Sequence, residues 1–172
     1  MAFSNAVTEG HLNFRFSRAD DCATKYDDWF FYRKQFNGAF GGTKAVDIVF
    51  IDTCQTWLIE VKDYRNNPRT KTIDLGEEIA LKVRDTLNGL IAAKHNATDA
   101  DEKRFARKAL AKHQFRVVLH LEQPRKKSKL FPKAIDVSKV QLKLKQWLKA
   151  LDAHPNVVDK GSLKAAMPWI VV

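Results

Sequence analysis

The segment AVDIVFIDTCQTWLIEVKDYR, residues 45–65, constrains the fold of this chain more than any other part of its sequence. Two runs rich in β-branched residues, 46–51 and 56–61, flank the four residues 52–55. This spacing predicts two antiparallel strands joined by a tight turn. The segment is mostly apolar but contains Asp47, Glu60 and Lys62. Charges within buried strands are costly unless they are paired or bind a ligand, so these three residues need an explanation.

The bulk properties predict one globular domain over residues 1–172. Hydrophobic residues make up 45% of the chain and charged residues 29%, which is ordinary for a soluble protein of this length. No apolar run reaches the ~18 residues that a membrane helix needs. The first residues lack the apolar region of a signal peptide, and the two cysteines form no metal or redox motif. We therefore expect a cytoplasmic protein with no membrane partner.

The charge of the chain is divided unevenly between its two parts. Residues 103–172 contain 17 Lys and Arg against four acids, a net charge of +13, whereas residues 1–102 contain 13 against 16, a net charge of −3. A basic part beside an acidic part indicates a polyanionic partner, although a solvated lysine-rich surface would give the same excess. The basic run within residues 124–132 is one candidate for phosphate contacts: Arg125, Lys126, Lys127 and Lys129.

Hydrophobic periodicity and capping signals predict the remaining elements. We expect a short strand at 12–16, a helix over 23–36, a helix after Asp74, a second helix from about Thr98 to Lys112, and a strand over 115–121. A helix from about Ser138 and a strand at 168–172 follow. The order predicts an α/β fold with a mixed central sheet and flanking helices. Residues 23–121 would form its core and residues 122–172 a basic C-terminal elaboration.

The charged residues of the hairpin are predicted to form a small site. Asp47 begins one strand and Glu60 ends the next, so the two lie side by side, and Lys62 shares the sheet face of Glu60. Two close carboxylates suit Mg²⁺, with Mn²⁺ as a substitute and the carbonyl of Val61 as a further ligand. Lys62 would orient water or stabilise charge on a phosphate. The alternative is an exposed Glu60–Lys62 ion pair, worth ~0–1 kcal/mol.

The spacing of these residues resembles that of a known superfamily. Asp47, a gap of twelve residues and then Glu60-Val61-Lys62 is similar to the core motif of the PD-(D/E)XK nucleases. The resemblance covers residues 23–121 and implies a restriction endonuclease-like αβββαβ core. It also implies an acid on the opening helix, for which the candidates are Asp27 as a catalytic residue and Asp28 as a metal ligand, although both could simply be acids favoured near a helix N-terminus.

The function that follows from this resemblance is metal-dependent hydrolysis of phosphodiester bonds. We expect a Mg-dependent endonuclease whose nucleic acid is DNA; the residues alone leave RNA open, and they also leave a homodimer open. The alternative is a non-catalytic nuclease-like module that binds nucleic acid or a protein partner. Beside the basic run, three residues near the hairpin are expected to contact nucleic acid: Lys44, Tyr64 and Arg65.

Overall fold

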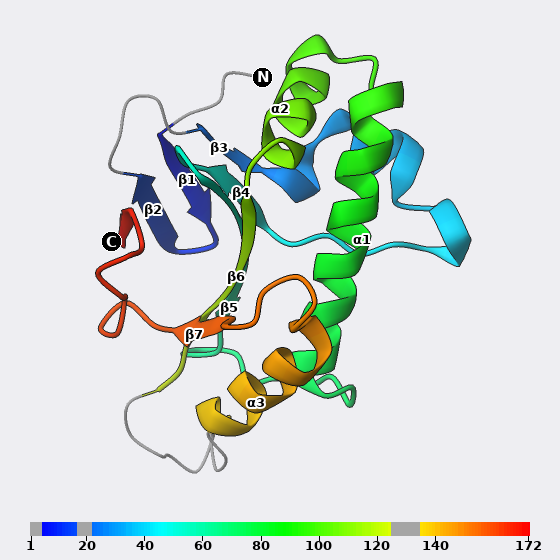
Figure 1. The fold of residues 1–172 in the computed structure, drawn as a ribbon. Coiled ribbons are helices and arrows are strands. Elements are labelled where there is room, and N and C mark those ends of the chain that lie inside the picture. The colour runs from blue at the N-terminus through cyan, green and yellow to red at the C-terminus, as the bar shows by residue number, and fades with distance from the viewer. Residues whose placement is uncertain (1–4, 17–21, 125–134) are drawn as a thin grey trace.

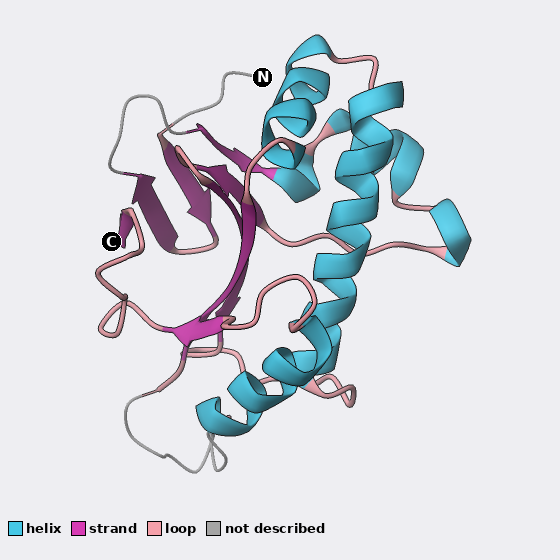
Figure 2. Ribbon diagram, viewed as in Figure 1, coloured by secondary structure: helices cyan, strands magenta, loops and turns pink. Residues whose placement is uncertain are grey.

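The computed structural model describes residues 5–16, 22–124 and 135–172. Within these residues the chain forms three layers: a group of helices, a central five-stranded sheet and a smaller three-stranded sheet (Figure 1). The helices cover one face of the central sheet and the smaller sheet covers the other (Figure 2). The chain is therefore a mixed α/β fold, as the sequence predicts.

The central sheet is mixed. Its strands, in spatial order, are β3 (Cys22–Lys25), β4 (Ile48–Ile51), β5 (Gln55–Asp63), β6 (Gln114–Glu122) and β7 (Asn156–Val158). The first three strands pair antiparallel, and β6 and β7 continue the sheet in parallel pairing. The predicted hairpin is thus confirmed as β4–β5, with Ile48 opposite Ile59. The finer prediction, a restriction endonuclease-like core, stays a prediction.

The apolar sequence of β4 reflects burial of both faces of the central sheet. Ile48 and Phe50 pack toward the smaller sheet, whereas Val49 and Ile51 pack toward the helices. All four side chains are fully buried. A strand covered on both faces has no solvent side, so its sequence is a continuous apolar run instead of an alternation.

The smaller sheet joins the two ends of the described chain. It consists of β1 (Ala6–Glu9), β2 (Leu12–Phe16) and β8 (Trp169–Val171), and both pairings are antiparallel. The ring of Trp169 packs edge-on against Trp57 of the central sheet, with ring centroids 5.0 Å apart, and Phe16 stacks on Phe50 at 4.3 Å. Aromatic burial therefore joins the two sheets.

The helices are α1 (Leu75–Asn96), α2 (Ala100–Leu110) and α3 (Val137–Leu148). Asp74 caps α1, as predicted, by accepting a hydrogen bond from the backbone N–H of Glu77 at 3.0 Å. Asp99 rather than Thr98 caps α2, and Asp136 caps α3. Among the described residues, no helix combines the length and the apolar character that crossing a membrane requires.

The helix predicted over 23–36 is wrong in its first half, and only residues 30–36 are helical. The segment begins with β3, continues as a single 3₁₀ turn, η1 (Tyr26–Asp28), and ends in a π-helical turn, η2 (Tyr32–Phe36). Pairing with β4 buries Ala23 and Thr24, which the helical pattern did not require. The backbone N–H groups of Phe30 and Phe31 donate to the buried carboxylate of Glu102 at 2.7 and 3.0 Å. Tertiary contacts thus replace the hydrogen bonds that a helix would have supplied.

Candidate functional site

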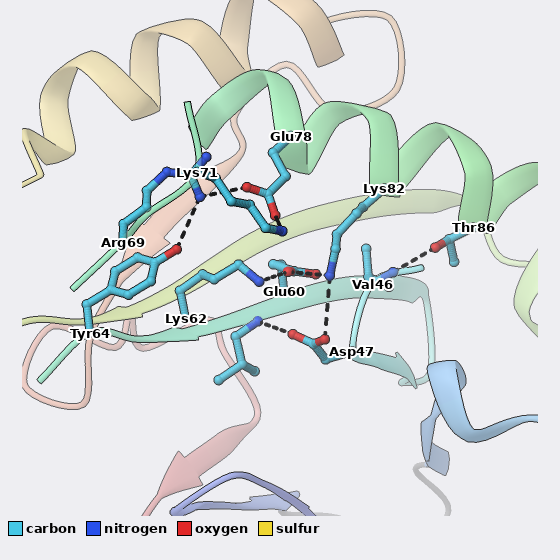
Figure 3. Close-up of polar contacts among 11 residues, drawn as sticks. Val46, Asp47, Glu60, Lys62, Tyr64, Arg69, Lys71, Glu78, Lys82 and Thr86 are labelled. Carbon is cyan, nitrogen blue, oxygen red and sulfur yellow. Dashed lines mark hydrogen bonds and ion pairs between the residues drawn. The ribbon is translucent and has the colours of Figure 1, made fainter. Parts of the chain in front are cut away.

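The charged residues of the hairpin meet at the end of β4–β5. The register that pairs Ile48 with Ile59 continues to set Asp47 opposite Glu60. Asp47 Oδ2 accepts a hydrogen bond from the backbone N–H of Val61 at 2.7 Å, and Lys62 Nζ donates to Glu60 Oε1 at 2.5 Å (Figure 3). The structure therefore brings together the expected Asp47, Glu60 and Lys62. The contact it shows for Val61 is through the amide nitrogen, not the carbonyl proposed as a metal ligand.

A second lysine, absent from the sequence prediction, completes this cluster. Lys82 extends from α1 so that its Nζ lies 2.6 Å from Glu60 Oε1 and 3.7 Å from Asp47 Oδ1 (Figure 3). The sequence position of Lys82 could have predicted its place in the site. It lies between Ile79 and Val83 on the stripe of α1 that faces the sheet, where a lysine is unusual. We call Asp47, Glu60, Lys62 and Lys82 the carboxylate–lysine cluster.

Burial controls the electrostatics of the cluster. Glu60 is fully buried, and this burial, together with the nearby charge of Asp47, raises its pKa to about 7 despite the two lysines. Burial alone would lower the pKa of Lys62, but the charge of Glu60 and their hydrogen bond raise it above its ordinary value. Near neutral pH, Glu60 therefore exchanges a proton while Lys62 stays charged.

The two acids of the 3₁₀ turn η1 differ in where they point. Burial, and then the charge of Asp47, raise the pKa of Asp27 to about 6, and Asp27 Oδ1 is a buried oxygen that accepts no hydrogen bond within the described residues. Asp28 instead forms ion pairs with Lys25, at 3.7 Å, and with Arg33. Asp27 is thus the acid that could serve the site.

A group of ion pairs around Glu78 lies next to the cluster and includes Tyr64, which was expected to contact nucleic acid. Glu78 is fully buried and accepts hydrogen bonds at 2.6 Å from both Arg69 and Lys71. Burial by itself would raise the pKa of Glu78, but these two hydrogen bonds outweigh it and lower the pKa to about 2. Tyr64 is half-buried and its hydroxyl lies 3.3 Å from Arg69 (Figure 3). Tyr64 therefore supports this group, and its contact with nucleic acid stays a prediction.

The other expected nucleic-acid contacts are at the surface or outside the described residues. Arg65 is exposed, and its guanidinium hydrogen-bonds to Asp63 at 2.9 and 2.6 Å. Lys44 is exposed, and its backbone N–H donates to Asp85 at 3.0 Å. The basic run lies outside the described residues: Arg125, Lys126, Lys127 and Lys129.

The fit of the cluster to a divalent cation is partial. Glu60 Oε2 and Asp27 Oδ1 are buried oxygens that accept no hydrogen bond in the described part of the chain, and hard oxygen donors suit Mg²⁺. Within residues 5–16, 22–124 and 135–172, however, no three His, Cys, Asp or Glu side chains lie together as a ready-made metal site. Magnesium binding therefore stays a prediction.

Comparison with known proteins gives one relationship. The chain is 35% identical, over 176 aligned positions, to a cysteine–tRNA ligase of Neisseria meningitidis serogroup A / serotype 4A (strain DSM 15465 / Z2491). The alignment covers 83% of this chain, which spans about 25% of the ligase. No family model matches the sequence, and no solved structure matches it.

This relationship corrects the expected function. The relative is a ligase that joins cysteine to tRNA, not an enzyme that hydrolyses phosphodiester bonds. The expectation of a metal-dependent nuclease, and of a hydrolase in general, is therefore wrong. The motif misled because Glu60 and Lys62, two residues apart on one strand, also form a buried structural ion pair, here extended by Lys82. The resemblance to the PD-(D/E)XK fold itself stays a prediction.

Proposed function

We propose that this chain is a nucleic-acid-binding module that contacts tRNA and serves in the ligation of cysteine to tRNA. The observation that supports this proposal is the 35% identity to a cysteine–tRNA ligase, which extends over 83% of the chain. Because the chain spans about a quarter of that ligase, we propose a binding module and not the complete ligase. A net charge of +10 favours a polyanionic partner independently of the alignment.

The outer face of α3 is the surface that we assign to phosphate contacts. Val140, Leu144 and Leu148 are buried against the rest of the protein. The helix and the residue after it contain four lysines and no acid: Lys139, Lys143, Lys145 and Lys149. Trp147 is half exposed among them, with Lys143 Nζ 5.7 Å from its ring centroid. Lysines interspersed with an exposed aromatic ring are typical of surfaces that follow a nucleic-acid backbone.

Two acids flank this face. Asp136 is exposed and caps the first turn of α3 by accepting hydrogen bonds from the backbone N–H groups of Ser138 and Lys139. Asp152 follows α3 but is only 3% exposed. Its carboxylate accepts hydrogen bonds from the backbone N–H of Val117 at 2.8 Å and of His154 at 2.9 Å, and forms an ion pair with Arg116 at 3.3 Å. Its charge is directed into the protein, so the lysines of α3 remain available to phosphates.

Binding of tRNA over a range of salt concentrations tests this proposal. Fluorescence anisotropy should show affinity that falls with salt, because each phosphate contact releases counterions and adds about −0.7 to −0.9 to the slope of log affinity against log salt. Replacing Lys145 and Lys149 with Ala should reduce the size of that slope by roughly 1.4–1.8. The matched control replaces Lys160 and Lys164, two exposed lysines that are not part of α3, and should leave the slope nearly unchanged.

Two results would contradict the proposal. If the wild-type protein shows no salt-dependent affinity for tRNA, the chain is not a tRNA-binding module. If the chain alone joins cysteine to tRNA in an aminoacylation assay, it is itself the ligase, and the assignment of a binding role is wrong.

We also propose that Asp47 and Glu60, as a pair of carboxylates, bind Mg²⁺ or Mn²⁺, an idea favoured by the buried Oε2 of Glu60, which accepts no hydrogen bond in the described residues. Such a cation would take its remaining ligands from water. Calorimetric titration should show divalent binding that Asp47→Asn removes and that Asp28→Asn, a control on the same side of the protein, retains. Equal binding by Asp47→Asn would place any cation elsewhere.

A further inference from the structure

The loop between η2 and β4 presents one aromatic side chain to solvent. Phe40 is 88% exposed, whereas Phe36, four residues earlier, is buried. Phe40 has φ 55° and ψ 28°, a left-handed conformation that bulky residues rarely adopt. Backbone strain of this kind persists only where surrounding contacts impose it, and it concentrates at ligand-binding positions. Neither burial nor local conformational preference explains why a phenylalanine occupies this position.

Hydrogen bonds on both sides of Phe40 hold the loop in this shape. The backbone N–H of Gly42 donates to the carbonyl of Ala39 at 2.9 Å, and the N–H of Thr43 donates to the carbonyl of Asn37 at 2.7 Å. The hydroxyl of Tyr32 donates to the carbonyl of Thr43 at 3.1 Å. The loop is therefore fixed before any ligand binds, which lowers the entropic cost of using it.

The orientation of the ring is also defined by packing. The buried ring of Phe36 lies edge-on to that of Phe40, with centroids 6.2 Å apart and an interplanar angle of 76°. Figure 1 shows the segment that contains residue 40 projecting beyond α1, on the side away from the sheets. One contact thus positions the ring while most of its surface stays open to a ligand.

The segment that carries Phe40 also carries two exposed lysines. Residues 33–44 contain Arg33, Lys34 and Lys44 and no acid. Arg33 is paired with Asp28, which leaves the two lysines. Lys34 and Lys44 are both exposed. An aromatic ring beside exposed cations complements a base and its flanking phosphates, and it does not complement an apolar partner, which would leave these cations without counter-charges.

We propose that Phe40 stacks on an unpaired nucleobase of bound RNA, with Lys34 and Lys44 contacting the phosphates on either side. This inference rests on the proposed function and specifies the kind of RNA that the chain recognises. An unpaired base is required because bases within a duplex are already stacked on their neighbours. Stacking is tolerant of base identity, so Phe40 selects unpaired nucleotides and not a particular sequence.

Binding of three RNA probes tests this inference: a short single strand, an abasic strand of the same length, and the single strand annealed to its complement. Phe40→Ala should weaken binding of the single strand roughly 5- to 150-fold, the range for loss of one stacked base. Binding of the abasic and duplex probes, which retain the phosphates, should change little. Ile170→Ala removes an exposed apolar side chain on β8 and is the matched control, with all three affinities unchanged.

A glycine substitution separates stacking from stability. Phe40→Gly should raise the melting temperature, because glycine adopts positive φ without strain, and yet should weaken single-strand binding as much as Phe40→Ala. Phe40→Trp should retain or strengthen that binding. A merely structural role for the ring would instead lower the melting temperature of both small variants.

The possible failures are distinguishable. If the wild-type protein binds tRNA and Phe40→Ala binds the single strand equally well, the inference is wrong and the proposed function stands. If the wild-type protein binds no RNA, both are wrong. If Phe40→Ala converts a dimer to a monomer in sedimentation while leaving RNA affinity unchanged, Phe40 contacts a second copy of the chain, and the inference is wrong.

Discussion

Glu60→Gln should change how the stability of this protein depends on pH. The pKa of Glu60 is raised from 4.5 to about 7 in the folded protein. Between these values the folded state binds more protons than the unfolded state, so the free energy of unfolding falls as pH rises. At about 1.4 kcal/mol for each pH unit, full titration of this buried carboxyl lowers the free energy of unfolding by about 3 kcal/mol. Glutamine cannot titrate, so the variant lacks this part of the decline.

Urea unfolding followed by tryptophan fluorescence, at several pH values from 4.5 to 8 and with a chelator present, measures the effect. The stability of Glu60→Gln relative to wild type should increase by about 3 kcal/mol across this range. His120, whose pKa burial lowers, makes stability rise with pH in part of the same range. Its contribution is common to both proteins, so the difference between them isolates Glu60.

Glu78→Gln is the matched control, because Glu78 is also a buried carboxylate with two cationic partners. Its pKa is lowered to about 2, so the stability it contributes is fully present above 4.5 and is lost only as pH falls further. Glu78→Gln should therefore be destabilised by the same amount at every pH from 4.5 to 8. If Glu60→Gln also differs from wild type by a constant amount, the reasoning about burial is refuted.

Three further predictions concern stability and can be checked by urea unfolding at pH 8. Lys82→Met leaves two neighbouring carboxylates short of a counter-charge and should lower the free energy of unfolding by about 3–5 kcal/mol. Lys71 is more exposed, so Lys71→Met should lower it by no more than about 1 kcal/mol. Equal losses would contradict the bridging role of Lys82. Gly89→Ala would place a methyl group 2.1 Å from the hydroxyl of the buried Tyr26 and should lower the free energy of unfolding by about 1–3 kcal/mol. Gly38 has open space around it, so Gly38→Ala should change stability by less than about 0.5 kcal/mol. If Gly89→Ala does not change stability, the core rearranges to accept the methyl group. Asp152→Ala leaves a buried backbone N–H without its acceptor and should cost about 1–3 kcal/mol, and a smaller loss would indicate that water replaces the carboxylate.

Local signals were sufficient for several elements of the fold. The β-branched runs on either side of residues 52–55 predicted β4 and β5, and Asp74 predicted the start of α1. In each case the information lies in neighbouring residues: a turn, a cap or a periodic stripe. The prediction of one helix over 23–36 failed because the residues that determine the structure of its first half are distant in sequence. Pairing with β4 and the carboxylate of Glu102 determine the path of the chain there.

The candidate site, like the fold, was predictable from the sequence only in part. The convergence of Asp47 and Glu60 follows from hairpin register, which sequence spacing reveals. The approach of Lys82 depends on how α1 crosses the sheet, which sequence spacing does not reveal. The function was harder to predict from the sequence than the geometry of the site, because two acids and a lysine at this spacing fit both catalysis and a structural ion-pair cluster. The basic charge pointed to nucleic acid on either interpretation.

The pairing of β2 with β8 has a consequence for synthesis on the ribosome. The backbone groups of Asn13 and Val172 exchange two hydrogen bonds of 3.0 Å, so during synthesis β2 waits for a strand made more than 150 residues later. Until residues 169–171 leave the exit tunnel, the nascent chain lacks the strand that completes the smaller sheet. Trp57 and Phe50 on the central sheet then lack the ring of Trp169 that covers them. A nascent chain stalled before residue 169 should therefore expose an aromatic surface that chaperones recognise.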